Sequence, residues 1–96
     1  LLAVSHPDLV LSALVRTAAG VAVRLYEAAG RPVAGARVEA AMTGPLEVHE
    51  TDLVGRRTRL VTRIGAGRPA AFTFDVHGFG IRTFEIAPPA ASTGAR

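Results

Sequence analysis

The side chains that could carry chemistry are two histidine neighbourhoods among scattered carboxylates. His49 and Asp52 stand three positions apart with Glu50 between them, and His77 follows Asp75 by two positions. A metal centre or a histidine–carboxylate pair would need such groups to converge on one point. Along an extended strand, His49 and Glu50 point to opposite faces, so they could share a metal ion only across a bulge. We therefore predict no metal site and interpret both histidines as surface or loop residues.

No other catalytic arrangement stands out in the sequence. No serine or cysteine nucleophile lies near His77, and the chain has no cysteine. Glycoside hydrolysis needs two carboxylates held about 5–9.5 Å apart across the sugar, and the eight acidic residues are too scattered to nominate a pair. The glycines fall at turns, and none opens a helix as a phosphate-binding loop does. We expect no catalytic, cofactor-binding or metal-binding residue in this chain.

The composition indicates one small domain without a nucleic-acid or membrane partner. A length of 96 residues fits a single domain. All basic residues are arginine, and the net charge of +3 is too small for a nucleic-acid-binding stripe. The densest basic segment, residues 56–63, alternates with threonine and leucine and is interpreted as a solvated strand face. No apolar run reaches the roughly 18–20 residues of a membrane span. The absence of cysteine favours a reducing, cytoplasmic location.

Short alternating segments, separated by turn signals about every eight to twelve residues, predict an all-β fold. We expect an antiparallel β-sandwich of about seven short strands. These strands are expected at residues 9–16, 21–26, 36–42, 46–51, 57–64, 71–76 and 81–86, preceded by a stub at 1–4.

The two ends of the predicted domain carry their own signals. Residues 9–16 are apolar at nearly every position, which predicts a strand covered on both faces. Pro88 and Pro89 cannot continue a strand ladder. The domain is therefore expected to span residues 1–89, and residues 90–96 to be a disordered tail. Because the sequence opens at Leu1 inside a predicted strand, we expect it to belong to a longer polypeptide.

Four stretches of the chain bear on its family. They are residues 10–16 (Val-Leu-Ser-Ala-Leu-Val-Arg), 23–32 (Val-Arg-Leu-Tyr-Glu-Ala-Ala-Gly-Arg-Pro), 50–56 (Glu-Thr-Asp-Leu-Val-Gly-Arg) and 79–86 (Phe-Gly-Ile-Arg-Thr-Phe-Glu-Ile). In this order and spacing they resemble the C-terminal β-sandwich of glycoside hydrolase family 38 α-mannosidases. The resemblance covers roughly residues 8–87. One departure is His77-Gly78, which stands where the family usually has a proline.

The resemblance implies a non-catalytic domain of a larger enzyme that removes terminal α-linked mannose. Members of the family are zinc-dependent retaining enzymes whose zinc ligands, nucleophile and acid/base group lie in an N-terminal α/β barrel. None of those residues can be carried onto this chain, so zinc is expected only in the parent enzyme. The implied partner is the catalytic domain of the same polypeptide, which the sandwich would support.

The matched side chains are interpreted as structural or inter-domain residues: Arg24, Glu27, Thr51, Asp52, Leu53, Phe79, Ile81, Arg82 and Thr83. Arg24 and Glu27 are expected to flank a hairpin, residues 51–53 to shape a bend, and residues 81–83 to close the sheet. Either the loop 77–80 or the bend 52–56 could approach the substrate cleft of the parent.

Two other classes of module compete with this interpretation. Residues 30–38 (Gly-Arg-Pro-Val-Ala-Gly-Ala-Arg-Val) resemble a hairpin of carboxypeptidase-regulatory or transthyretin-like sandwiches, which are accessory or adhesive modules. An independent carbohydrate-binding platform would present a row of Trp or Tyr, and we do not expect one here, because the chain has no Trp and one Tyr. The other open class is a binding module of no assigned family. We also expect the isolated chain to self-associate through an uncovered strand, because burying one Leu or Val contributes about 1.5–3 kcal/mol.

Overall fold

The structure, a computed structural model, describes residues 2–89, which form eight β-strands and no helix. The strands are β1 (Leu2–Val4), β2 (Leu9–Arg16), β3 (Val21–Glu27), β4 (Val33–Thr43), β5 (Leu46–Thr51), β6 (Arg57–Ile64), β7 (Pro69–Val76) and β8 (Ile81–Ala87). The predicted all-β class is confirmed, and the stub at the start of the chain forms an eighth strand. The predicted tail, residues 90–96, lies outside the described residues.

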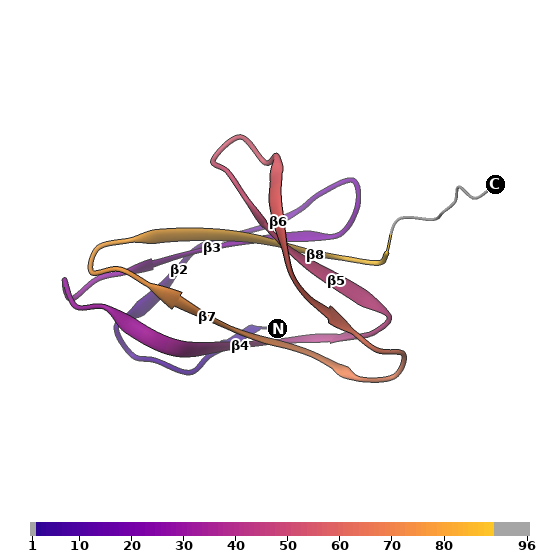
Figure 1. Ribbon diagram of the computed structural model, residues 1–96, viewed down its shortest axis with the longest axis horizontal. Helices are drawn as coiled ribbons and strands as arrows, with labels where there is room; N and C mark the ends of the chain where they lie inside the picture. The colour runs from indigo at the N-terminus through magenta and orange to yellow at the C-terminus, as the bar shows by residue number, and fades with distance from the viewer. Residues whose placement is uncertain (1, 90–96) are drawn as a thin grey trace.

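The strands form two antiparallel sheets of unequal width. One has three strands in the order β1-β4-β7, and the other has five in the order β2-β3-β8-β5-β6. Figure 1 shows β4 and β7 on one side of the molecule and β3 and β8 on the other. The last strand, β8, was expected to close the sheet, but it does not lie at an edge. It lies in the middle of the wider sheet, between β3 and β5.

Residues 30–38, expected to form a hairpin, instead cross from one sheet to the other. β3 belongs to the five-stranded sheet and β4 to the three-stranded sheet, and the two do not pair. β4 also begins at Val33, before its predicted start at Ala36. A bulge between these two residues explains the difference, because Gly35 adopts a φ of +67° there and lets the strand continue through it. The carboxylate of Asp75 accepts a hydrogen bond from the Gly35 amide at 2.8 Å.

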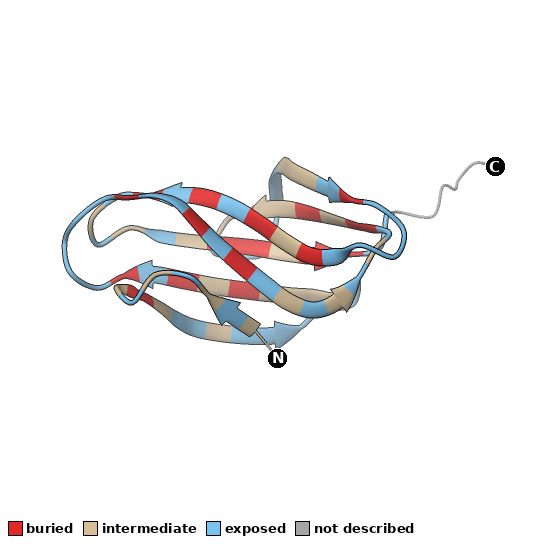
Figure 2. Ribbon diagram, turned by 90° about the horizontal axis from the view of Figure 1, so that it is seen from below, coloured by how far each residue is buried: buried red, intermediate tan, exposed pale blue. Residues whose placement is uncertain are grey.

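The core lies between the sheets and follows the predicted alternation. Figure 2 shows buried and exposed residues alternating along the strands. Its centre is a cluster of three phenylalanines, in which the ring of Phe84 lies 5.0 Å from that of Phe72 and 4.8 Å from that of Phe74. Val23 and Leu25 from β3 are fully buried in the same core. These three are the only aromatic side chains that are buried in the core among the described residues.

The first long strand, β2, is less buried than the sequence predicts. Leu9 is buried, but Leu11, Leu14 and Val15 are 38%, 50% and 55% exposed. β2 is an edge strand of the five-stranded sheet, and the opposite sheet has only three strands. The apolar sequence of β2 predicts that both of its faces are buried, but no other part of residues 2–89 buries them.

The burial pattern predicts that substitutions of two leucines have very different effects on the free energy of unfolding. Replacing Leu25, which is fully buried, with Ala should lower the free energy of unfolding by about 2–5 kcal/mol, because the core loses contacts and gains a cavity. Replacing Leu53, which is 68% exposed, should change it by no more than about 0.5 kcal/mol. Chemical denaturation of both variants measures the two values, and similar losses would contradict this assignment of the core.

Candidate interaction surface

The outer face of the five-stranded sheet carries a row of apolar side chains across three strands. Val10 of β2 stands opposite Tyr26 of β3, and Tyr26 stands opposite Ile81 of β8. Tyr26 and Ile81 are 38% and 55% exposed. Val15 lies on the same face, since it pairs with Ala22. We call Val10, Val15, Tyr26 and Ile81 the outer apolar face.

The next row of the same face is polar, and a side-chain hydrogen bond joins two of its three members. Arg24 stands opposite Thr83, and its Nε donates a hydrogen bond of 3.3 Å to the Thr83 hydroxyl. Thr83 in turn pairs with Thr51 of β5, and both threonines are buried. Three of the predicted structural residues therefore form one row across β3, β8 and β5. This row lies between Val15 and the other members of the outer apolar face.

Glu27 is the principal support beneath this surface. Its side chain is fully buried and points into the molecule, on the same side of β3 as Leu25. Its carboxylate accepts hydrogen bonds from the backbone amides of Ala29 at 2.8 Å, Gly30 at 2.6 Å, Arg31 at 2.9 Å and Phe79 at 2.9 Å. One side chain thus fixes both the turn after β3 and the turn before β8.

The electrostatics of Glu27 follow from these bonds. Burial alone would raise the pKa of its carboxyl group, because it disfavours the charged form. The four backbone donors outweigh that effect and hold the pKa below its ordinary value of 4.5. Glu27 is therefore a permanently ionised structural anchor at neutral pH.

Phe79 is presented at the tip of the turn between β7 and β8. Its side chain is 71% exposed, and its backbone has a φ of 58°, a conformation that non-glycine residues seldom adopt. A Cβ atom on Gly30 would lie 2.7 Å from the Phe79 ring, so only glycine fits there at a φ of +80°. Glu27 holds both sides of this contact in place through its bonds to the Gly30 and Phe79 amides.

Arg82 does not share the outer face with its neighbours. It lies over the Phe84 ring, with 5.5 Å between the guanidinium carbon and the ring centroid. Its Nη2 donates to the Glu50 carboxylate at 2.9 Å, and its Nη1 donates to the backbone carbonyl of Asp75 on the opposite sheet. The Arg82 bond lowers the pKa of Glu50, against the effect of its burial. Arg82 therefore ties the two sheets together.

The bend after β5 forms as predicted and displays two apolar side chains. The Asp52 carboxylate accepts hydrogen bonds from the backbone amides of Val54 at 3.1 Å and Arg56 at 2.9 Å. Leu53 and Val54, at its tip, are 68% and 77% exposed. The Asp52 carboxylate thus shapes a turn that presents apolar side chains to solvent.

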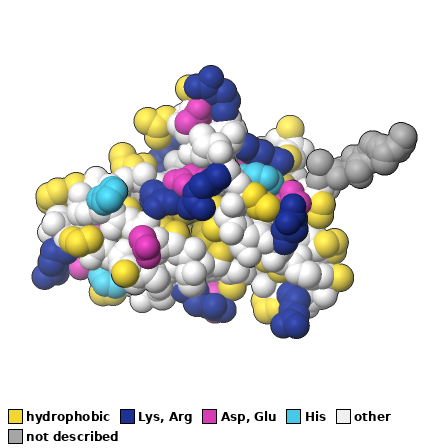
Figure 3. All heavy atoms as spheres, viewed as in Figure 1, with side chains coloured by type: hydrophobic (Ala, Val, Ile, Leu, Met, Phe, Trp, Pro, Cys, Tyr) yellow, Lys and Arg dark blue, Asp and Glu magenta, His cyan; other side chains and the backbone are white. Residues whose placement is uncertain are grey.

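The basic strand β6 is neutralised by its neighbours. Its arginines pair with glutamates of β5 and β8 in the following bonds: Arg57–Glu85 at 2.8 Å, Arg59–Glu50 at 3.0 Å and Arg63–Glu47 at 3.2 Å. Figure 3 shows positive and negative side chains next to one another rather than in separate patches. The segment 56–63 is therefore an ion-paired strand face rather than a free basic surface.

The two histidine neighbourhoods do not converge into a site. Glu50 turns inward to Arg82, whereas the His49 Nε2 lies 3.9 Å from the Glu47 carboxylate. The Asp75 carboxylate binds the Gly35 amide instead of His77. Within residues 2–89, no group of three potential ligands could hold a metal ion.

Burial of Glu27 is the feature that sequence reasoning missed. The alternation that places Val21, Val23 and Leu25 on the inner face of β3 continues two positions further to Glu27. A carboxylate at an inward position directly before a turn must find hydrogen-bond donors there, because a buried charge without partners is unfavourable. It could have been read from the sequence.

Comparison with protein-family models, curated proteins and solved structures found no match for this chain. The described part of the chain has no helix that could cross a bilayer.

The Glu27 anchor predicts a specific pH dependence of stability. Because the pKa of Glu27 is lower in the folded state, its contribution is complete above about pH 4.5 and is lost as the pH falls through the folded value. Glu27→Gln should therefore destabilise the chain at pH 7, and its deficit relative to the wild type should shrink below pH 4.5. Glu39→Gln, at an exposed carboxylate, is the matched control and should have little effect. Denaturation midpoints from pH 7 to 3 measure both, and a pH-independent deficit for Glu27→Gln would contradict the assignment.

Proposed function

We propose that this chain is a non-catalytic β-sandwich of a family 38 α-mannosidase and packs against the catalytic domain of that enzyme. The parent would hydrolyse terminal α-linked mannose in the cytoplasm. In this proposal the zinc ion and the bond-breaking groups belong to the catalytic domain. This chain would contribute a rigid surface and no reacting atom.

The observation that carries the proposal is where the four matched stretches fall in the fold. Residues 10–16 lie in β2, residues 23–32 in β3 and its turn, residues 50–56 in the end of β5 and its bend, and residues 79–86 in β8 and its preceding turn. All four contribute to the five-stranded sheet, and none lies in the strands of the three-stranded sheet. The outer apolar face belongs to this same sheet, so the resemblance and the exposed apolar surface coincide.

The energetics favour covering this face. Tyr26, Ile81 and Val15 each keep between 38% and 55% of their surface exposed. Full burial of such a side chain contributes about 1.5–3 kcal/mol, so burying the half that remains exposed would contribute about half of that each before the entropy of association is subtracted. Within one polypeptide that entropy is reduced, because the linker holds the partners together. A tethered catalytic domain is therefore a suitable partner for this surface.

The full-length gene product tests the proposal. We expect it to release mannose from an α-mannoside, and we expect the double variant Tyr26→Glu and Ile81→Glu to lose activity several-fold faster on heating, since charges cannot be buried against the catalytic domain. Thr73→Glu, on an exposed position of the three-stranded sheet, is the control and should behave as the wild type. A full-length product without α-mannosidase activity would contradict the proposal, as would equal heat sensitivity of all three proteins.

The isolated chain provides a second test of the uncovered surface. With its partner absent, we expect concentration-dependent self-association, because the edge strand β2 offers unpaired backbone groups beside Leu14 and Val15. Val15→Glu should shift the association to at least several-fold higher concentration, whereas Thr73→Glu should not. Sedimentation velocity measures this, and a wild-type chain that stays monomeric at high concentration would contradict the prediction.

A further inference from the structure

Arg24 lies in the middle of the outer apolar face. It stands two positions before Tyr26, so both side chains lie on the same side of β3. One neighbouring row of this face holds Val10, Tyr26 and Ile81. Val15 lies in the neighbouring row on the other side. A partner that covers both rows therefore encloses the Arg24 side chain.

The guanidinium of Arg24 forms one hydrogen bond and no ion pair with residues 2–89. Its Nε donates to the Thr83 hydroxyl at 3.3 Å, which holds the side chain across the sheet toward β8. All eight acidic residues of the sequence lie in the described part of the chain, and each is bonded to another group. They are Asp8, Glu27, Glu39, Glu47, Glu50, Asp52, Asp75 and Glu85.

The polar row that contains Arg24 has more hydrogen-bond donors than acceptors. The Thr83 hydroxyl already accepts from Arg24. Thr51, the third member of the row, has a buried hydroxyl without a partner among the described residues. The carboxylate of Glu85, two positions further along β8 on the same face, is already paired with Arg57 at 2.8 Å. The row therefore lacks an acceptor and carries one positive charge.

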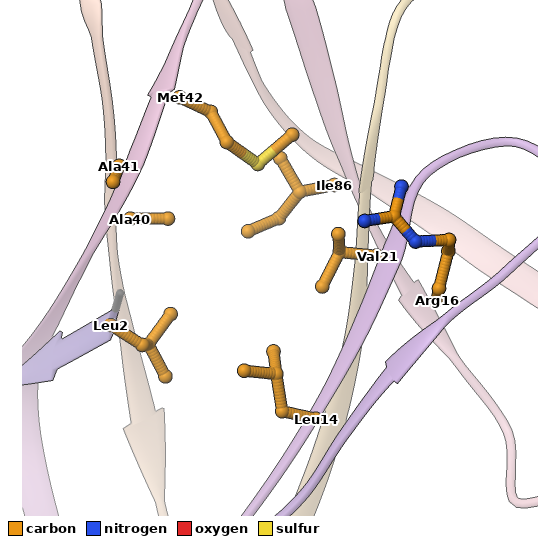
Figure 4. A pocket seen from close by; sticks show the side chains of 8 residues that line it. All are labelled: Leu2, Leu14, Arg16, Val21, Ala40, Ala41, Met42 and Ile86. Atoms are coloured by element: carbon orange, nitrogen blue, oxygen red, sulfur yellow. The ribbon is translucent and has the colours of Figure 1, made fainter.

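Arg24 differs from the other two arginines that have no ion pair within residues 2–89. These are Arg16 and Arg68, and both are exposed. Figure 4 shows Arg16 beside an apolar cavity of about 280 Å³, which Leu2 of β1 and Leu14 of β2 help to line. An exposed guanidinium stays hydrated and needs no other partner. Arg24 is already half-buried and lies on the surface that we expect to be covered.

We propose that the partner that covers the outer apolar face presents an aspartate or glutamate carboxylate to the Arg24 guanidinium. The source is the catalytic domain, and this assignment rests on the proposed function. Burying the charge of Arg24 without a partner is strongly unfavourable, whereas a carboxylate can accept two parallel N–H bonds from Nη1 and Nη2. The pair fixes which part of the partner lies over β3 and β8, because a mismatched charge at this point opposes docking.

A second copy of this chain is a poorer partner for Arg24. Two copies joined through this face would bring their arginine-containing rows close together, and like charges across an interface repel. The carboxylates of Glu47 and Glu85, on the same face, are already paired with Arg63 and Arg57. A polypeptide with a carboxylate that is not already paired is therefore the better match.

A zero-length cross-link tests the pair in the full-length gene product. The 96 residues contain no lysine, so Arg24→Lys gives them a single side-chain amine. A carbodiimide joins this amine to a carboxylate in direct contact: the amine nitrogen replaces one carboxylate oxygen, which leaves in the urea by-product. We expect a cross-link from position 24 to an aspartate or glutamate of the catalytic domain. The control Arg68→Lys, at an exposed arginine, should give at least several-fold less cross-link to that domain.

Three other results would overturn the proposal. A cross-link confined to Glu85 or another carboxylate of these 96 residues would place the partner inside the chain. A cross-link between two copies, identified by mixing isotope-labelled and unlabelled protein, would assign the surface to self-association. Equal yields from Arg24→Lys and Arg68→Lys would show that no carboxylate is held at Arg24.

Exchanging the charges provides a second measurement. Arg24→Glu should lower the unfolding temperature of the full-length protein, because two negative charges then meet in the covered surface. Replacing the cross-linked acidic residue with arginine should also lower it, and the two substitutions together should restore at least half of the loss. Arg68→Glu is the matched control and should unfold as the wild type. A double variant no more stable than either single variant would contradict the pair.

The isolated chain shows whether Arg24→Glu acts through docking. Arg24 faces solvent there, so we expect the substitution to change the denaturation midpoint little. A loss as large as in the full-length protein would mean that Arg24 only supports the fold of this chain, and would overturn the proposal.

This proposal and the proposed function can fail separately. An active α-mannosidase without the cross-link would remove the Arg24 pair and leave the proposed function standing. A cross-link to polypeptide outside residues 1–96, in a product without α-mannosidase activity, would remove the enzymatic assignment and leave the pair in place.

Discussion

The end of the sandwich that carries Phe79 and Ile81 depends on the buried carboxylate of Glu27. Four backbone amides from two separate turns donate to this one side chain. A buried charge without partners would be strongly unfavourable, so the turns and the carboxylate stabilise each other only when all are in place. The main chain adds to this junction, because the Glu27 amide donates to the Gly80 carbonyl and the Ala28 amide to the Asp8 carbonyl. Glu27 thereby sets the geometry of the surface that we propose for docking.

The second constraint is the unequal width of the sheets. A sandwich buries each strand's inner face only where the other sheet lies opposite, and here five strands face three. The excess falls at β2, whose apolar side chains remain exposed, and at the cavity beside β1. Both incomplete regions lie on the same flank of the fold. A partner on this flank would complete the sandwich, whereas the ion-paired β6 on the other flank offers salt bridges that are already formed.

Much of the fold follows from the sequence because alternation is a local property. The strands from β3 to β8 could be placed within a few residues, and the alternation along β3 matches the burial of Val23 and Leu25. Sheet membership could not be read in the same way. The turn after Glu27 has glycine and proline signals that suit either a hairpin or a crossing between sheets, and only the long-range pairing of β3 with β8 and of β4 with β7 decides between them. The role of Arg82 was hidden for the same reason, since its partners Glu50 and Asp75 are distant in sequence.

The central proposal is that a larger partner covers the outer face of the five-stranded sheet. Hydrogen–deuterium exchange, compared between the isolated chain and the full-length polypeptide to which we propose that it belongs, tests it most directly. The account predicts that the amides of β2, together with those around Tyr26 and Ile81, exchange at least tenfold more slowly in the full-length protein, while the outer positions of β7 do not change. Equal exchange of β2 in both proteins would show that this face stays open to water and would contradict the account.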